Sequence, residues 1–232
     1  MLRGPLRHRD LRGSGDLRAA RQAFPVAVGI LPSPHRTVSA VADRPFLDRS
    51  FFASDPVRCA EALVGCTLVW GACAGIVVET EAYAAEGDAA CHTFRRPSAR
   101  QFVADHPAGA AYVYFNYGMH WLANVLVKGE AEGFVLLRAV QPVAGLAWMR
   151  RRRGPRDVAE LCSGPGRLAR AFGIDGRHHG VDLCAGGRRG FLARVRTPEI
   201  VRGPRVGISL AQEKPWRFAV GGNPHVSRPR PG

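Results

Sequence analysis

Apolar and polar residues alternate in short runs over much of the chain, and these runs are rich in β-branched and aromatic residues. Alternation of this kind predicts β-strands, because every second side chain of a strand points to the same face. The predicted strands cover residues 67–70, 75–83, 111–117, 121–128 and 134–140, and two shorter strands are predicted over 206–210 and 217–220.

Helical spacing of apolar residues occurs in three places. The segment 55–64 opens with an Asp-Pro pair suited to a helix start. A second pattern begins at Val143 and runs into the arginines that end at Arg153, and a third covers 165–172 after a Ser-Gly pair. Helices and strands in this order predict one mixed α/β domain of the α+β class, with an antiparallel sheet flanked by helices.

The predicted strands 111–117 and 121–128 are separated by very few residues, so they should form a tight antiparallel hairpin. Gly118 can adopt the positive φ that such a turn needs. Tyr117 and Met119 should then lie at the protruding tip of the hairpin.

Residues 1–45 hold eight arginines and three aspartates and keep no apolar period for two turns. This composition predicts a basic, disordered arm over 1–45, followed by a globular domain over 46–232. A start codon assigned too far upstream is the alternative explanation for this segment, and the sequence does not separate the two.

The chain has 232 residues, of which 46% are hydrophobic and 22% charged, as in an ordinary globular protein. No uninterrupted apolar run reaches the ~18 residues of a membrane span, and no secretion signal is visible, so a soluble cytoplasmic protein is expected. The net charge of +14 favours a polyanionic partner, with nucleic acid first. Only Lys128 and Lys214 are lysines, and an excess of arginine can also come from a GC-rich genome.

The six cysteines form no C-x-x-C pair and have no histidine at zinc-finger spacing. Reduced thiols are therefore expected, and no metal site is predicted. His178 and His179 lie near Cys184 in the sequence, but a pair of histidines in a loop is more often simply solvated.

Two carboxylates and a phenol share one face of the predicted strand 75–83, namely Glu79, Glu81 and Tyr83. A solvent-facing strand would explain such acids without chemistry. His92 follows closely, however, and the next strand offers Tyr112 and Tyr114 on one face. Together these residues could stack a flat heterocycle and activate a water molecule.

Seven segments resemble, in the same order, the alkyladenine (3-methyladenine) DNA glycosylase family of base-excision repair enzymes. They are VETEAY (78–83), ACH (90–92), AYVYFNYGM (111–119), VLLRA (135–139), LCSGP (161–165), GPRVGI (203–208) and GGNPHVS (221–227). The resemblance covers about residues 48–227 and says nothing of 1–45. It implies a curved antiparallel sheet with a protruding hairpin, like the C-terminal domain of formyltransferases.

The resemblance also assigns roles to individual residues. Glu81 corresponds to the water-activating carboxylate and Arg138 to the arginine near the water and phosphate, whereas Glu79 is the weaker catalytic candidate. The remaining assignments are base stacking by Tyr83, His92 and Tyr114, crowding of a guanine amino group by Asn124, intercalation by Tyr117, and DNA contacts by Gly118, Met119 and Arg100.

The implied reaction is hydrolysis of the N-glycosidic bond of an alkylated or deaminated purine, such as 3-methyladenine, 7-methylguanine or hypoxanthine. The base would be flipped out of double-stranded DNA, and an abasic site would remain. No cofactor and no lyase activity are implied, since the matched motifs contain no lysine, and a monomer in the bacterial cytosol is expected.

Three departures from the family pattern stand near His92. Gln101 and the pair Ala104–Asp105 replace the usual residues of the segment that follows, which is expected to be a loop, and Cys91 directly precedes the histidine.

Two rival functions remain open. A non-catalytic binder of damaged DNA would not need an acid such as Glu81, and an enzyme acting on RNA or free nucleosides would not need a wedge such as Tyr117.

Overall fold

The computed structural model describes residues 44–231. Its centre is an eight-stranded antiparallel sheet in the order β3-β4-β5-β2-β1-β6, and β8 pairs with both β2 and β7. The strands are β1 (Thr67–Trp70), β2 (Cys73–Ala84), β3 (Ala111–Asn116), β4 (His120–Lys128), β5 (Glu132–Ala144), β6 (Arg189–Leu192), β7 (Ile200–Gly203) and β8 (Arg217–Val220). The mixed α/β class and the antiparallel sheet predicted from the sequence are confirmed.

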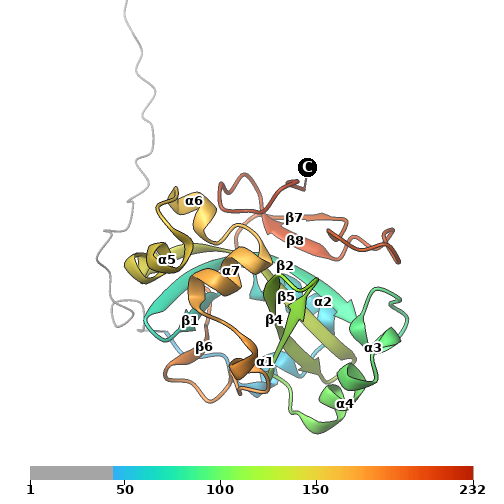
Figure 1. Cartoon of the computed structure of the whole chain (residues 1–232). Helices are drawn as coiled ribbons and strands as arrows, with labels where there is room; N and C mark the ends of the chain where they lie inside the picture. The colour runs from blue at the N-terminus through green and yellow to red at the C-terminus, as the bar shows by residue number, and fades with distance from the viewer. Residues whose placement is uncertain (1–43, 232) are drawn as a thin grey trace, which may run out of the picture. The chain divides into compact units, whose positions relative to one another are not determined.

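Helices flank this curved sheet (Figure 1). They are α1 (Arg49–Phe52), α2 (Pro56–Leu63), α3 (His92–Arg95), α4 (Pro97–Asp105), α5 (Leu146–Arg153), α6 (Val158–Leu161) and α7 (Pro165–Phe172), with a 3₁₀ turn at Gly176–His178. Figure 1 shows α5, α6 and α7 together on one side of the molecule, and α3 and α4 on the other. No helix within residues 44–231 is long and apolar enough to cross a bilayer.

The sequence signals at the helix starts explain two of these helices. Asp55 accepts hydrogen bonds from the backbone N–H groups of Val57 and Arg58, so it caps α2 as its Asp-Pro pair predicts. Pro165 is the first residue of α7, and Gly173 ends the helix with a positive φ of 72°. Both predicted helices are confirmed.

The two longest strands, β2 and β5, pair at the centre of the sheet. Around Val78 a bulge changes the register of this pairing. The main core lies between this sheet and the helices, and it contains Phe52, Leu63, Met149 and Phe172, all almost fully buried. A second, smaller core holds Phe102 of α4 against Tyr112 and Phe134.

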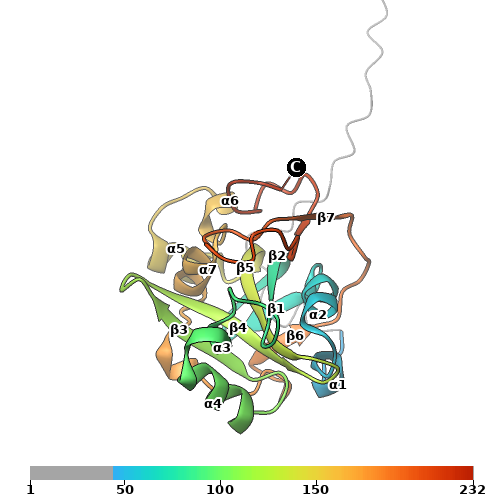
Figure 2. The same ribbon diagram turned by 90° about the vertical axis from the view of Figure 1, so that its right-hand side faces the viewer.

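The β3–β4 hairpin projects from the body of the molecule, as Figure 2 shows. The backbone N–H of Met119 donates to the carbonyl of Asn116, and both Tyr117 and Gly118 have positive φ values, 49° and 65°. The predicted hairpin and its tip residues are confirmed. The positive φ of Tyr117 was not predicted, because a non-glycine residue rarely adopts it.

Three expectations are corrected. Val143 belongs to β5 and not to a helix, since the ladder to β2 continues to Ala144. Residues 206–210 form no strand but an irregular loop, in which Gly207 has a φ of 77°. The segment after His92 is not a loop, because Pro97–Asp105 forms helix α4.

The arm expected over residues 1–45 lies almost entirely outside the described residues. Its last part does not behave as an arm. The guanidinium of Arg44 donates to the carbonyl of Ala193 and to the hydroxyl of Thr67, and Leu47 donates to the carbonyl of Phe191. By these contacts the folded domain begins no later than Arg44.

Candidate active site

A cavity of about 590 Å³ opens beside the β3–β4 hairpin, between α3, the start of α7 and the loop 206–210. Residues of four strands (β2, β3, β4 and β5), of α3 and the segment before it, of the start of α7 and of the loop 206–210 form the wall. It includes six residues that the sequence singles out: Tyr83, His92, Tyr114, Tyr117, Asn124 and Arg138. The tertiary structure therefore brings most of the predicted site together.

Glu81 is fully buried directly behind this wall. Its Oε2 accepts a hydrogen bond of 2.8 Å from the Tyr83 hydroxyl, and its Oε1 accepts one of 2.7 Å from the backbone N–H of Val206. Arg138 Nη1 lies 3.2 Å from the same Oε1. A carboxylate offers about four acceptor positions, so Oε2, which has Tyr83 as its partner, keeps one for a further donor such as water.

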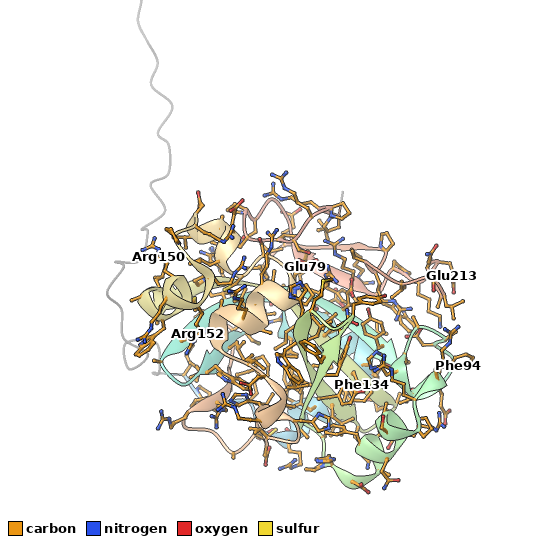
Figure 3. All side chains as sticks on the ribbon, viewed as in Figure 1. Glu79, Phe94, Phe134, Arg150, Arg152 and Glu213 are labelled. Atoms are coloured by element: carbon orange, nitrogen blue, oxygen red, sulfur yellow. The ribbon has the colours of Figure 1, made fainter. Side chains whose placement is uncertain are left out.

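Glu79 lies two residues earlier on β2 and has a different environment. Its Oε1 accepts hydrogen bonds from Arg138 Nε, Arg217 Nε and the Ser227 hydroxyl, and its Oε2 accepts one from the Ser227 backbone. Figure 3 shows Glu79 near the centre of the molecule. With no exposed surface and its oxygens engaged by the protein, Glu79 ties β2 to the C-terminal segment and does not face the cavity.

The surroundings set the protonation of the site. Burial raises the pKa of Glu81, against the opposing effects of Arg138, the Val206 N–H and the Tyr83 hydroxyl. Burial opposes the charge of Arg138, but the Glu81 and Glu79 carboxylates outweigh it and raise the pKa of this guanidinium. Burial and the neighbouring Glu81 charge raise the pKa of Tyr83, so its hydroxyl remains a donor. Glu81 is thus a carboxylate with increased proton affinity beside a fixed cation.

Aromatic rings line the cavity next to these charges. The rings of His92 and Tyr114 lie 4.3 Å apart and that of Tyr112 lies 5.9 Å from His92. His92 Nδ1 is 3.1 Å from the Tyr112 hydroxyl. Burial, and secondarily Arg96, lowers the pKa of His92 to about 4, so the imidazole is neutral at pH 7. The rings of His92 and Tyr114 thus lie edge to face in the cavity wall, with their planes 60° apart.

Asn124 faces the cavity from β4. Its amide nitrogen donates to the carbonyl of Tyr112, its partner on β3, and its side chain is almost fully buried. This hydrogen bond fixes the orientation of the amide in the wall.

The hairpin tip carries the most exposed apolar side chains at the rim of the cavity. Tyr117 is 81% exposed and Met119 is 67% exposed, so neither side chain is packed into the protein. The turn through Gly118 holds both outward.

Arg100 is a predicted DNA contact that, like Gly118 and Met119 of the hairpin tip, does not belong to the cavity wall. It lies on α4, and its guanidinium donates to the carbonyl of Thr93. Cys91 is buried and accepts a hydrogen bond from the Thr93 hydroxyl, and burial raises the pKa of its thiol. Gln101 and Asp105 bond each other on the surface of α4, so these departures change the outside of the helix.

Sequence reasoning missed the support of Tyr83 by Arg205. The Arg205 guanidinium lies 4.7 Å from the Tyr83 ring centre, and the buried carboxylate of Asp88 holds it with contacts of 2.6 and 2.8 Å. The motif GPRVGI contained Arg205 and Val206, but a strand was predicted there. The loop instead turns the Val206 N–H toward Glu81, which only the tertiary structure reveals.

Cations ring the mouth of the cavity. Arg95, Arg96 and Arg167 belong to its wall, and all three are exposed. A phosphate-bearing ligand at the mouth would meet positive charge on two sides. Among residues 44–231, no cluster of three or more His, Cys, Asp or Glu side chains could hold a metal ion.

Comparison with known proteins agrees with this geometry. Residues 50–224 match the family described as methylpurine-DNA glycosylase. A protein of Rhodopseudomonas palustris (strain BisB18), named "Putative 3-methyladenine DNA glycosylase", is 45% identical over 196 residues, which cover 84% of this chain and 96% of the relative. Proteins of the same name from Nitrosospira multiformis and Chlorobaculum tepidum are each 40% identical, over 77% and 80% of this chain and 92% of their own. The chain belongs to the methylpurine-DNA glycosylase family.

Proposed function

We propose that this protein is a monofunctional DNA glycosylase that removes alkylated or deaminated purines, of the 3-methyladenine, 7-methylguanine and hypoxanthine type. The single observation that carries the proposal is the buried Glu81 carboxylate behind a tyrosine-lined cavity, with Arg138 beside it and an exposed wedge at the rim. The family and the names of its relatives support the same activity.

In the proposed reaction, the damaged nucleotide leaves the duplex and its base enters the cavity. Tyr83 comes from one strand, while His92 and Tyr114 form a second aromatic surface, so a planar base finds rings to stack on. A purine alkylated at a ring nitrogen is cationic and gains further from π faces. Tyr117 fills the gap that the extruded nucleotide leaves in the stack.

Hydrolysis needs a water molecule that attacks C1′ of the sugar as the bond to the base breaks. Glu81 accepts the proton of this water, and the departing base carries away the bonding electrons. Tyr83 and Arg138 both line the cavity and both touch Glu81, so we place the water between them. The fixed charge of Arg138 holds Glu81 in position and offsets part of its burial.

Neutral His92 fits a base-stacking role. A protonated imidazole would repel a cationic base, whereas a neutral ring of low pKa does not. Asn124 would contact the edge of the base and reject bulkier edges, such as the exocyclic amine of guanine.

The test is Glu81→Gln, which keeps the shape but cannot accept the proton of water. We expect base release from a duplex with one alkylated adenine or hypoxanthine to fall by about 10²-fold or more in single turnover. Binding to that duplex should persist. A Gln variant that releases base at a near-normal rate would exclude Glu81 as the base.

Monofunctional chemistry has a separate test. Borohydride added during turnover should trap no protein–DNA adduct, because no amine attacks the sugar. An adduct that disappears in Lys128→Arg or Lys214→Arg would instead establish an amine nucleophile.

A further inference from the structure

A second cavity, of about 550 Å³, lies at the far end of α7 from the candidate active site. Phe172 and Gly173, at the C-terminal end of this helix, line it, whereas Pro165 and Arg167, at the N-terminal end, line the first cavity. The helix Pro165–Phe172 has eight residues, which corresponds to a length of about 12 Å. The two cavities are therefore neighbours along one short element.

The wall of the second cavity is rich in cations and has no carboxylate. Four arginines and two tryptophans belong to it: Arg152, Arg177, Arg188, Arg189, Trp70 and Trp148. Of these arginines only Arg177 forms an ion pair among residues 44–231, with Asp175. Arg189 Nε is buried and has no hydrogen-bond partner in that same part of the chain. Guanidinium groups gathered in this way suit phosphate oxygens.

The two tryptophans of this cavity lie beside its arginines. Arg189 lies 5.5 Å from the Trp70 ring centre, and Trp70 is only 5% exposed. The guanidinium groups of Arg151 and Arg152 lie 5.7 and 5.9 Å from the ring centre of Trp148. The rings thus hold guanidinium groups in place, and the cavity presents charge to a ligand more than a stacking face.

Further arginines lie on the elements that border the two cavities. We call this set the arginine stripe; it belongs to α5, the next loop and α7, and consists of Arg150, Arg151, Arg152, Arg153, Arg156, Arg167 and Arg170. None of these seven forms an ion pair with a carboxylate within residues 44–231. Arg167 lines the first cavity and Arg152 the second.

One member of the stripe, Arg153, lies near three others. Burial, followed by the charges of Arg156, Arg167 and Arg170, lowers the pKa of Arg153. Figure 3 shows Arg150 and Arg152 on the α5 side of the molecule, where the second cavity lies, and Phe94 on the opposite side. The exposed Arg95 and Arg96 follow Phe94 in the chain, so both sides carry cations, and the second cavity adds a group of them on the α5 side. Cations without carboxylate partners favour a polyanionic ligand.

We propose that the arginine stripe and the second cavity bind the phosphates of the DNA strand on one side of the extruded base, an inference that rests on the proposed function. The two cavities lie at opposite ends of α7, whose length of about 12 Å equals three to four base pairs at ~3.4 Å each. Contacts of the second cavity should therefore begin about four nucleotides from the lesion, on one flank only. The enzyme then holds DNA asymmetrically about the damaged base.

The test variant combines Arg151→Gln, in the stripe, with Arg188→Gln, in the wall of the second cavity, and we call it the stripe variant. Both side chains are exposed, and neither makes a hydrogen bond with residues 44–231. The matched control combines Arg58→Gln with Arg202→Gln, which removes the same charge from exposed arginines paired with Glu130 and Glu61. The probes are two duplexes with a stable abasic-site analogue, one with a long flank only 5′ of the site and one with it only 3′.

We expect the stripe variant to bind one of the two duplexes roughly tenfold more weakly at 0.1 M salt. The slope of log affinity against log salt should become shallower by roughly two for that duplex alone. The control variant should bind both duplexes like the unmodified protein. Equal losses on both duplexes, or no loss on either, would overturn the proposal.

A free nucleotide offers the same phosphate chemistry, so ATP binding is measured as a separate arm. A stripe variant that loses ATP affinity but keeps both duplex affinities would show that the cavity serves a free nucleotide, against the proposal. Base release is measured on an alkylated duplex without the long flank, where the variant should match the unmodified protein. If the unmodified protein releases no base yet shows one-sided binding, the proposed function fails and the phosphate site stands.

Discussion

Glu79 and Glu81 show how two identical side chains on one strand acquire separate roles. Both contact Arg138, at 2.9 and 3.2 Å, but Glu79 also accepts hydrogen bonds from Arg217 and Ser227. Glu79 pairs with two buried guanidinium groups, whereas Glu81 lies next to the cavity wall with a spare acceptor position on Oε2. Stability and chemistry are therefore assigned to neighbouring carboxylates.

Glu79→Gln should lower the free energy of unfolding by about 3–5 kcal/mol, because Arg138 and Arg217 would lose the carboxylate that neutralises them in the interior. Urea denaturation measures this change. Glu81→Gln is the matched control. Burial raises the pKa of Glu81, so ionised Glu81 opposes folding at neutral pH, and its neutralisation should cost much less. Equal destabilisation by both variants would contradict these separate roles.

The pH dependence of base release should follow Glu81. The carboxylate must be ionised to accept a proton, and its pKa is raised by burial, so the single-turnover rate should increase with pH until Glu81 is deprotonated, above the pH of an ordinary glutamate. His92, with a pKa lowered to about 4, is already neutral in that range.

Tyr83→Phe sharpens this assignment. Loss of the hydroxyl removes a hydrogen bond that favours ionised Glu81, so the inflection of the pH profile should move to higher pH. A stacking defect alone would lower the rate without moving the inflection. An inflection that stays in place would contradict control of the profile by Glu81.

At the scale of elements, the β3–β4 hairpin exposes an aromatic side chain at a residue with an unfavourable backbone conformation. Tyr117 has a φ of 49°, a region that costs a non-glycine residue about 1 kcal/mol or more, and its ring is 81% exposed. Because the ring is mostly exposed, its packing within the described residues offsets little of this cost. A role in the DNA complex would account for it.

Tyr117→Ala and Tyr117→Gly both remove the ring, but only glycine also relieves the positive φ. We expect both variants to release base from a fully paired duplex more slowly, since the extruded nucleotide falls back into the stack. The free energy of unfolding of the glycine variant should exceed that of the alanine variant by about 1 kcal/mol, so the glycine variant should unfold at a higher denaturant concentration. A mismatched lesion is the control, and equal rate losses on paired and mismatched lesions would reduce Tyr117 to a folding residue.

At the scale of the whole molecule, charge is unevenly placed along the chain. Residues 1–42 hold seven arginines and two aspartates, and the full chain carries +14. Because Arg44 contacts Ala193 and Thr67, a shortened chain should begin at Asp43 and not beyond Arg44.

Removal of residues 1–42 should leave single-turnover base release by saturating enzyme unchanged, since residues 83–210 of the described part of the chain form the wall of the first cavity. Affinity for undamaged duplex should decrease, and its dependence on salt should become shallower because fewer counterions are released. Binding across a salt series measures this. An unchanged slope would show that the segment does not touch DNA, and a collapse of base release would contradict an independent catalytic domain.

The sequence by itself determined the elements whose signals are local. Alternation predicted the five long strands, Asp55 and Pro56 fixed the start of α2, and the short connection at Gly118 fixed the hairpin. The motifs also placed Glu81, Tyr83 and His92 in one site. These features follow from residues near one another in the chain, so a single sequence contains them.

Only the tertiary structure decided the features that depend on distant partners. The loop 206–210 is not a strand, because Glu81 and not a neighbouring strand takes the Val206 N–H. Val143 stays in β5 because β2 is long enough to pair with it. Glu79 and Glu81 look alike in the sequence, and their roles separate only where Arg217 and Ser227 arrive from the end of the chain. Burial and pairing are properties of the folded chain, which is why periodicity could not assign them.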